Sequence, residues 1–445
     1  MRRPLGVVSL ALSSFFVAPV AHGRESPPPS AVAPQAPGRV LTLDDALALA
    51  KRANKNIIAE RARLAQAQTN IDQAWAVLLP TITAQGKYTR NYKEVSLPFG
   101  GTGNLLIQPL NQLDGQVGFT APLLVIAAYP GLKSVKQGVA SQEANFEATE
   151  DQVLLSVAQA FYAAAATDEV LISRHSNIEV ARATLQNAQT RFSAGTVTKV
   201  DVDRAELALV RADQLEREAL YAHEQTYRAL GTLIQLDGPF TLKLPTATEP
   251  LPATDTSQGN LDLVLHLRPE FRALEMAVLS AESSVRTDAW RWAPSLSAFG
   301  NARKFNYENF GQNRYSWAVG AQLDWVIYDG GQRDALRHQS AAQADEARAR
   351  GEALRDSIRD DLANGRTFLE TKQRALDAST RSVTLAQETL DLVRTQYEAG
   401  TVTQVDLLQA QDNLVVSQEA LAQAHFDVAV ADISLRHTAG TFPPK

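Results

Sequence analysis

Cysteine is absent from the 445 residues of this chain, and histidine occurs only seven times. Without cysteine the chain can form neither a disulfide framework nor a Cys-based metal site, and a mature N-terminal cysteine cannot carry a lipid. The histidines are scattered, with no paired metal-ligand spacing. The sequence also has no nucleophile-elbow or P-loop motif. These absences argue against an enzyme, and we expect neither a cofactor nor a metal.

Long apolar runs are missing after the first 23 residues. No later stretch of about 18 apolar residues could form a transmembrane helix, so any insertion into a membrane must use strands. The start of the chain has Arg2 and Arg3, an apolar run over 5–20, and the small-residue site Ala21-His22-Gly23. This pattern predicts a signal peptide over 1–23. The alternative is a membrane anchor, but the run is short for a spanning helix.

A strong charge of either sign is also missing. The formal net charge is −6, and loss of the two arginines of the signal would leave −8. A mildly acidic exported chain gives no reason to expect nucleic acid. Residues 24–40 are rich in Pro, Ala and Ser and predict a flexible leader.

An eight-residue stretch occurs twice in the chain. Residues 194–201, AGTVTKVD, return as 399–406, AGTVTQVD, with seven of the eight identical at an offset of 205. Apolar residues recur every seventh position upstream of both copies and downstream of the second, which is typical of left-handed coiled helices. Each glycine then marks the turn between two such helices. Two matching copies indicate an internal duplication.

The two repeats predict the same order of elements: helix, β-hairpin, long helix, turn and helix. We place the first repeat at 41–236, a Pro-rich linker at 237–260, the second repeat at 261–438 and a short tail at 439–445. The expected helices cover 42–78, 129–192, 200–233, 261–292 (with a kink or restart at 268–270), 332–397 and 403–438. The expected strands begin at 81 and near 116 around a loop at 93–113, and then follow Pro294 around a loop at 308–313.

The strands alternate between an apolar and a polar side. Around the last strand, Trp317 to Trp325 supply apolar side chains at every second position, with small or polar residues between. This is the pattern of a barrel with a lipid-facing outside and a wet lumen. Four strands cannot close a barrel, which needs about eight. Because open sheet edges are excluded from lipid, the pattern predicts an oligomer. A soluble four-stranded sheet with one buried face is the alternative.

Several motifs in this order resemble the TolC-like outer-membrane efflux protein family over essentially all of 41–438. They are Leu43-Asp44-Asp45-Ala46-Leu47, Ala74-Trp75 with Pro80, Ala289-Trp290 with Pro294, Asp329-Gly330-Gly331, and the run from Tyr397 to Ala410. The first repeat departs from the family at 124–131, where an apolar stretch replaces the usual Gly-Gly turn.

The resemblance implies a mixed α+β membrane protein. In it, a homotrimer joins a twelve-stranded transmembrane β-barrel, four strands from each chain, to an α-helical barrel that crosses the periplasm. The implied role is a passive exit duct for efflux or type I secretion, located in the outer membrane among its lipids. The implied partners are a periplasmic membrane-fusion adaptor and an inner-membrane pump. The sequence does not identify the transported substrate, because a tunnel selects little among substrates.

The resemblance also assigns site residues, all in the repeated turns. Asp406 matches a carboxylate that lines the narrowest ring of the pore, and Gln409 stands where the family has a second acid. Tyr397 and Asp201 match an aromatic and an acid that hold the closed tip together. Val402 replaces an arginine of the family's latch, and Lys199 offers a cation instead. Four further positions match the adaptor-docking tips: Gly195, Thr196, Gly400 and Thr401.

Two alternatives remain beside this interpretation. Asp406 and Asp201 also fit an ordinary helix-start carboxylate, which the helix dipole favours. The whole chain also fits an exported coiled-coil scaffold or adhesin without a pore, although strands bounded by tryptophan argue against it.

Overall fold

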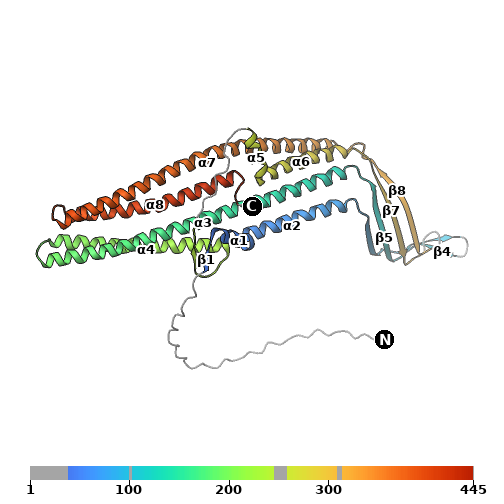
Figure 1. Ribbon diagram of the computed structural model, residues 1–445. Helices are drawn as coiled ribbons and strands as arrows, with labels where there is room; N and C mark the ends of the chain where they lie inside the picture. Colours follow the sequence, from blue (N-terminus) through green and yellow to red (C-terminus); the bar gives the residue numbers. More distant parts are fainter. Residues whose placement is uncertain (1–38, 100–102, 245–257, 308–312, 444–445) are drawn as a thin grey trace, which may run out of the picture.

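The long helices of the chain lie side by side in one extended layer, with a sheet at one end and two helical hairpin tips at the other (Figure 1). This computed structural model describes residues 39–99, 103–244, 258–307 and 313–443. The expected signal peptide, almost all of the leader, most of the linker and residues 308–312 of the expected loop at 308–313 lie outside the described residues. None of the described helices is long and apolar enough to cross a membrane.

The second half of the chain follows the element order of the first. The first half contains β1 (Arg39–Leu41), α1 (Leu43–Ala53), α2 (Lys55–Ala76), β2 (Thr81–Arg90), β3 (Val95–Phe99), β4 (Gly103–Gln108), β5 (Asn111–Leu124), α3 (Ala128–Ser193), α4 (Lys199–Ile234) and β6 (Phe240–Leu242). The second half contains α5 (Gln258–Leu267), α6 (Pro269–Trp290), β7 (Ser295–Phe305), β8 (Tyr315–Asp324), α7 (Gln332–Glu398) and α8 (Gln404–Thr438).

The long helices of both halves lie within one or two residues of their expected ranges. The expected restart near 268–270 is also present, since Pro269 opens α6 at a position where a helix needs no backbone N–H partner. Single long helices therefore run from the sheet to the tips in each half.

The first entry helix was expected to be continuous over 42–78, and this is wrong. It breaks at Asn54, whose extended backbone (ψ 129°) ends α1 and begins α2. The Asn54 side chain accepts hydrogen bonds from the backbone N–H groups of Asn56 and Ile57, and it donates to the carbonyl of Leu233 at 2.8 Å. Asparagine is a strong helix cap, so this residue stabilises a break that apolar periodicity does not reveal.

The expected loop at 93–113 contains regular structure. β3 and β4 pair there as an antiparallel hairpin, and β5 begins at Asn111, earlier than expected. A second unexpected element joins the edge of the leader to the linker: β1 pairs in parallel with β6, Leu41 opposite Leu242. A strand of three residues is too short to show the alternating pattern from which strands are predicted.

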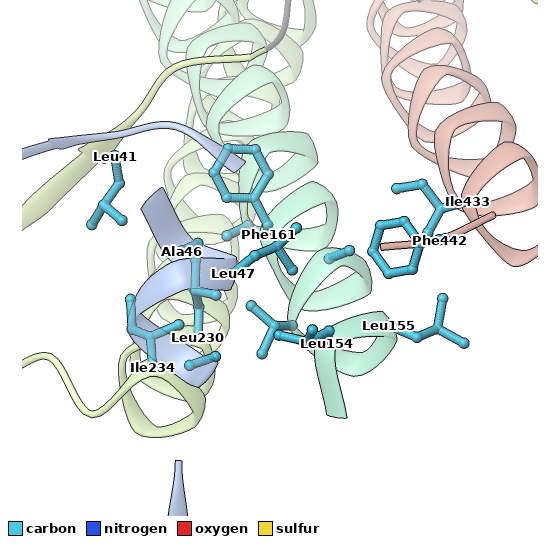
Figure 2. Packing of buried hydrophobic residues seen from close by; sticks show 14 of the residues in the cluster. Leu41, Ala46, Leu47, Leu154, Leu155, Phe161, Leu230, Ile234, Ile433 and Phe442 are labelled. Carbon is cyan, nitrogen blue, oxygen red and sulfur yellow. The ribbon is translucent and has the colours of Figure 1, made fainter. Parts of the chain in front are cut away.

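The largest apolar core lies beside this β1–β6 pair (Figure 2). Phe161 of α3 is fully buried there, and Leu230 and Ile234 of α4 pack from one side. Ile433 of α8 and Phe442 of the C-terminal tail close the cluster from the other side. This core therefore joins the two halves midway along the helices.

The main sheet has the order β2-β5-β7-β8 and is antiparallel throughout. Paired rows of side chains cross it, and successive rows point to opposite faces. We call the side that carries the mostly aliphatic and aromatic rows the apolar face, and the other the polar face. The rows of the apolar face that span all four strands are Ile82–Phe119–Gly300–Val319, Ala84–Val117–Ala302–Trp317 and Gly86–Gly115–Lys304–Tyr315. On β2 and β5 they are continued by Tyr88–Leu113 and Arg90–Asn111, and towards the helices they are preceded by Ala121–Ala298–Ala321 and Leu296–Leu323.

The two side edges of the layer can be followed from the sheet to the tips. Beside the sheet, α3 packs on α2 and α6, and α6 packs on α7; towards the tips, α3 packs on α4 and α8, and α8 packs on α7. One edge of the layer is therefore β2, α2 and α4, and the other is β8 and α7 (Figure 1).

Candidate gate at the hairpin tips

The two repeated turns have the same backbone structure. Gly195 and Gly400 end their helices with positive φ, 74° and 77°, where a side chain would be strained. The N–H of the residue after each glycine bonds back five residues: Thr196 to the Arg191 carbonyl at 2.9 Å, and Thr401 to the Gln396 carbonyl at 3.0 Å. Each threonine hydroxyl donates to that same carbonyl at 3.0 Å. The repeated sequence thus encodes a repeated helix end of the Schellman type.

The two aspartates of the turns cap the helices that follow. Asp201 accepts hydrogen bonds from the Thr198 backbone N–H at 3.0 Å and from its hydroxyl at 2.8 Å. Asp406 accepts the corresponding bonds from Thr403, at 2.9 Å and 2.6 Å. These bonds lower the pKa of both carboxyls, so both are ionised at neutral pH. The helix-start role, our alternative for these residues, is therefore present at both positions.

Tyr397 lies beneath a cation from the other hairpin. Its side chain is only 8% exposed, and the guanidinium carbon of Arg191 lies 4.8 Å from its ring centre. Such a distance permits a cation–π contact. Asp201, the acid that the family resemblance assigns to holding the closed tip, has an ion pair with Arg204 at 3.8 Å. The contact between hairpin tips therefore joins the end of α3 to the end of α7.

Two glutamines lie on the first turns of α8. Gln409 is exposed, one turn after Asp406, and donates to the Asn413 side chain at 3.1 Å. Gln404 is 4% exposed, and neither polar atom of its amide has a hydrogen-bond partner within the described structure. Its counterpart in the first turn, Lys199, is exposed and lies 4.0 Å from Asp203. Nothing in the sequence indicates the burial of Gln404.

Polar contacts join the hairpins along their flanks, between α3 and α8. Arg174 forms an ion pair with Glu419, and the Ser173 hydroxyl donates to Gln418 at 3.0 Å. Closer to the tips, the Gln411 amide donates to the Thr184 hydroxyl at 3.2 Å. Burial raises the pKa of Glu419, and Arg174 opposes this effect. The flanks of the two hairpins are thus joined by polar side chains of α3 and α8.

Within the described ranges, no three His, Asp or Glu side chains gather into a group that could hold a metal ion. The charged side chains described above at the tips cap helices, form ion pairs or, for Arg191, lie over the Tyr397 ring.

Comparison with known proteins gives one consistent result. A family model described as outer membrane efflux protein matches residues 46–235 and 260–441. The chain is 26% identical over 411 residues to "Outer membrane efflux protein BepC" of Brucella suis, covering 90% of this chain and 85% of the relative. It is also 26% identical over 320 residues to "Alkaline protease secretion protein AprF" of Pseudomonas aeruginosa, covering 69% and 65%.

A solved structure shares the fold. The Campylobacter jejuni CmeC outer membrane channel superposes with a TM-score of 0.76 at 17% identity, covering 89% of this chain and 85% of that one.

Proposed function

The chain belongs to the outer membrane efflux protein family, and on that basis we propose how its sheet, helices and tips act as an exit duct. The protein is a passive outer-membrane channel of Gram-negative bacteria and not an enzyme. Its relatives serve efflux and secretion, so its place is the outer-membrane end of a tripartite efflux or type I secretion system. The observation that carries the proposal is the pair of matching tips at the free end of the helical layer.

The working form is a homotrimer. The two side edges of a single chain differ, with β2, α2 and α4 on one side and β8 and α7 on the other. If the β8 edge of one copy pairs with the β2 edge of the next, every layer of the wall continues from copy to copy. Exposed leucines support this pairing on both helices: Leu385 and Leu392 on α7, and Leu207 on α4.

Three copies would supply twelve strands, enough to close a barrel of at least about eight. Closure satisfies the backbone groups of the edge strands β2 and β8, which lipid cannot do. In this barrel the apolar face of the sheet contacts lipid and the polar face lines the lumen. Val319 and Leu323 then lie in the membrane, whereas Gln85 and Gln116 face water.

The gate lies at the tips. In a closed trimer, the exposed Asp406 side chains form a ring of three negative charges, with Gln409 one turn further on. Like charges around one axis repel each other and attract cations. Tyr397 and Asp201 hold the closed form, the first through Arg191 and the second through its cap on α4. Because Val402 replaces an arginine, the contact between the hairpin tips relies on Arg191.

The tips also dock the partner proteins. Gly195 with Thr196, and Gly400 with Thr401, form two matched surfaces at the periplasmic end, and all four residues lie in tight turns. Paired, similar tips suit an adaptor that presents the same contact to both repeats. An inner-membrane pump would then drive transport through the adaptor, and the duct itself would supply no energy.

Single-channel recording in planar bilayers tests the duct and the ring together. We expect discrete, cation-preferring steps, with the preference weakened in Asp406→Asn. Thr403→Ala is the matched control, because it removes the cap partner and leaves the carboxylate in place. If the cation preference of the steps were unchanged in Asp406→Asn but altered in Thr403→Ala, Asp406 would act only as a helix cap. A detergent-independent monomer without current would overturn the duct.

A further inference from the structure

The apolar face of the sheet carries two charged side chains among its described residues, and both are cations. Arg90 ends β2, and Lys304 lies near the end of β7. Both lie at the end of the sheet that is remote from the helices, because α2 leads into the opposite end of β2 and α6 into the opposite end of β7. In an outer-membrane channel with its helices in the periplasm, this end lies in the outer leaflet.

A hollow of about 590 Å³ opens beside Lys304. Its floor includes Gly86, Gly115 and Ala302, and Tyr315 and Trp317 of β8 form a wall. The hollow is also lined by one row of the polar face: Gln85, Gln116, Arg303 and Ser316. Because the side chains of this row point to the other side of the sheet, the row borders the hollow through its backbone. The hollow therefore opens on the apolar face.

Two missing side chains create this hollow. A Cβ atom added at Gly86 would meet nothing within 4 Å, and one at Gly115 would meet only the Lys304 carbonyl, at 4.0 Å. Neither glycine has a positive φ, so neither is required by the backbone. By contrast, the apolar-face Gly300 is already covered by the ring of Phe119. No side chain covers the floor at Gly86 and Gly115, so a molecule beside the sheet can contact it.

The chemistry of the hollow is that of a lipid with a negative headgroup. Its floor and wall are apolar or aromatic, which suits an acyl chain, and Tyr and Trp favour the membrane interface. Lys304 is exposed and has no acidic partner among the described residues. An amine beside apolar surface at headgroup depth favours a phosphate, which it can bind through a charge-assisted hydrogen bond.

We propose that this hollow binds a phosphorylated glycolipid of the outer leaflet, of the lipid A type. One acyl chain lies over Gly86 and Gly115 against Trp317, and the Lys304 ammonium pairs with a glucosamine phosphate. Arg90 lies four residues beyond Gly86 on β2 and adds a second cation nearer the end of the sheet. The site rests on the outer-membrane location of the chain and on the sheet, and it is independent of the gate at the tips.

Native mass spectrometry of the detergent-solubilised full chain tests this site, with lipid A titrated as the probe. We expect Lys304→Ala to weaken lipid A binding about tenfold, the loss of one charge-assisted contact. Lys304→Arg should retain binding, and Gly86→Leu should weaken it by filling the floor while leaving the cation. Lys87→Ala is the matched control, because Lys87 lies one residue from Gly86 on the polar face.

Two further arms identify the ligand. Dephosphorylated lipid A should bind weakly, and its binding should be the same in the Lys304→Ala variant and the unaltered chain. Phosphatidylglycerol should bind less tightly than lipid A. An equal loss of lipid A binding in Lys87→Ala and Lys304→Ala would overturn the site, since a basic residue on either face would then contribute equally to binding. Phosphatidylglycerol binding as tight as that of lipid A would overturn the glycolipid as its occupant.

Discussion

The guanidinium of Arg191 lies over the ring of Tyr397, 4.8 Å from its centre, and joins the ends of two helices that belong to different repeats. The two residues are also backbone partners within their own tips. The Arg191 carbonyl accepts from Thr196, and the Tyr397 carbonyl accepts from Gly400. A movement of either turn is therefore transmitted directly to this contact.

Removal of the Arg191 side-chain charge should loosen the closed tip. A cation–π contact is worth about 0.5–2 kcal/mol, so Arg191→Gln should raise the open probability severalfold in bilayer recordings. Arg182→Gln is the matched control, because Arg182 pairs on the same helix with Glu179 and is exposed. An unchanged open probability in Arg191→Gln would show that the ring contact does not hold the tip.

Substitution of the tip glycine should destabilise the protein. Gly400 has φ 77°, which costs an L-residue about 1–2 kcal/mol, so Gly400→Ala should lower the melting temperature. Gly351→Ala is the control within the same pair of helices: it lies inside α7 with open space around it, and alanine there should stabilise the helix by about 0.5–1 kcal/mol. Melting shifts of the same sign for both variants would contradict the assignment of strain to the turn.

Two glycines of the apolar face should differ in their tolerance of alanine. A Cβ at Gly300 would lie 2.2 Å from the Phe119 ring, whereas one at Gly86 would meet nothing. Gly300→Ala should therefore lower the thermal stability of the folded protein and the yield of membrane-inserted chain, and Gly86→Ala should leave both nearly unchanged. The double variant Gly300→Ala with Phe119→Leu should recover part of the loss. If Gly300→Ala left both the thermal stability and the yield unchanged, the Phe119 ring would not pack over residue 300.

The cap and the proposed ring should respond to pH in the same direction. Hydrogen bonds from Thr403 lower the pKa of Asp406 below the ordinary 3.8. Because the folded pKa is the lower one, the stabilisation is fully present above 3.8 and disappears as the pH falls through the folded value. Cation preference, measured from reversal potentials, should therefore persist from neutral pH down to about pH 4 and decline below it.

Thr403→Ala removes the hydroxyl bond, the largest cause of the lowered pKa, and leaves the bond from the backbone N–H. The decline of the cation preference should therefore begin at a higher pH than in the unaltered chain. If the cation preference were already lost near pH 6, it would have to come from a titratable group other than Asp406.

The helices and tips could be predicted because their signals are local and repeated. The heptads before Gly195 and Gly400 fix the helices, and the glycines fix the turns. Asn54 was missed because one capping residue interrupts a helix without disturbing its apolar pattern. The β1–β6 pair was missed because its two strands lie about 200 residues apart and each has only three residues.

The site was predicted less completely than the fold. Asp201 and Asp406 were recognised, and the repeated Thr-x-x-Asp spacing also explains their caps. The contact of Tyr397 with Arg191 could not be predicted, because it depends on the way the two hairpins lie against each other. The burial of Gln404 has the same origin: the matching Lys199 in the other repeat is exposed.

The apolar core beside the β1–β6 pair has a consequence for the order in which the chain folds. Apart from Ile433 and Phe442, the described apolar core around Phe161 is built from residues 41–240. A chain that emerges N-terminus first can therefore fold most of this core before α7 and α8 appear. Ile433 and Phe442 arrive last and cover the side of α3 that carries Leu155, so the core is complete only when the last helix and the tail have folded against it.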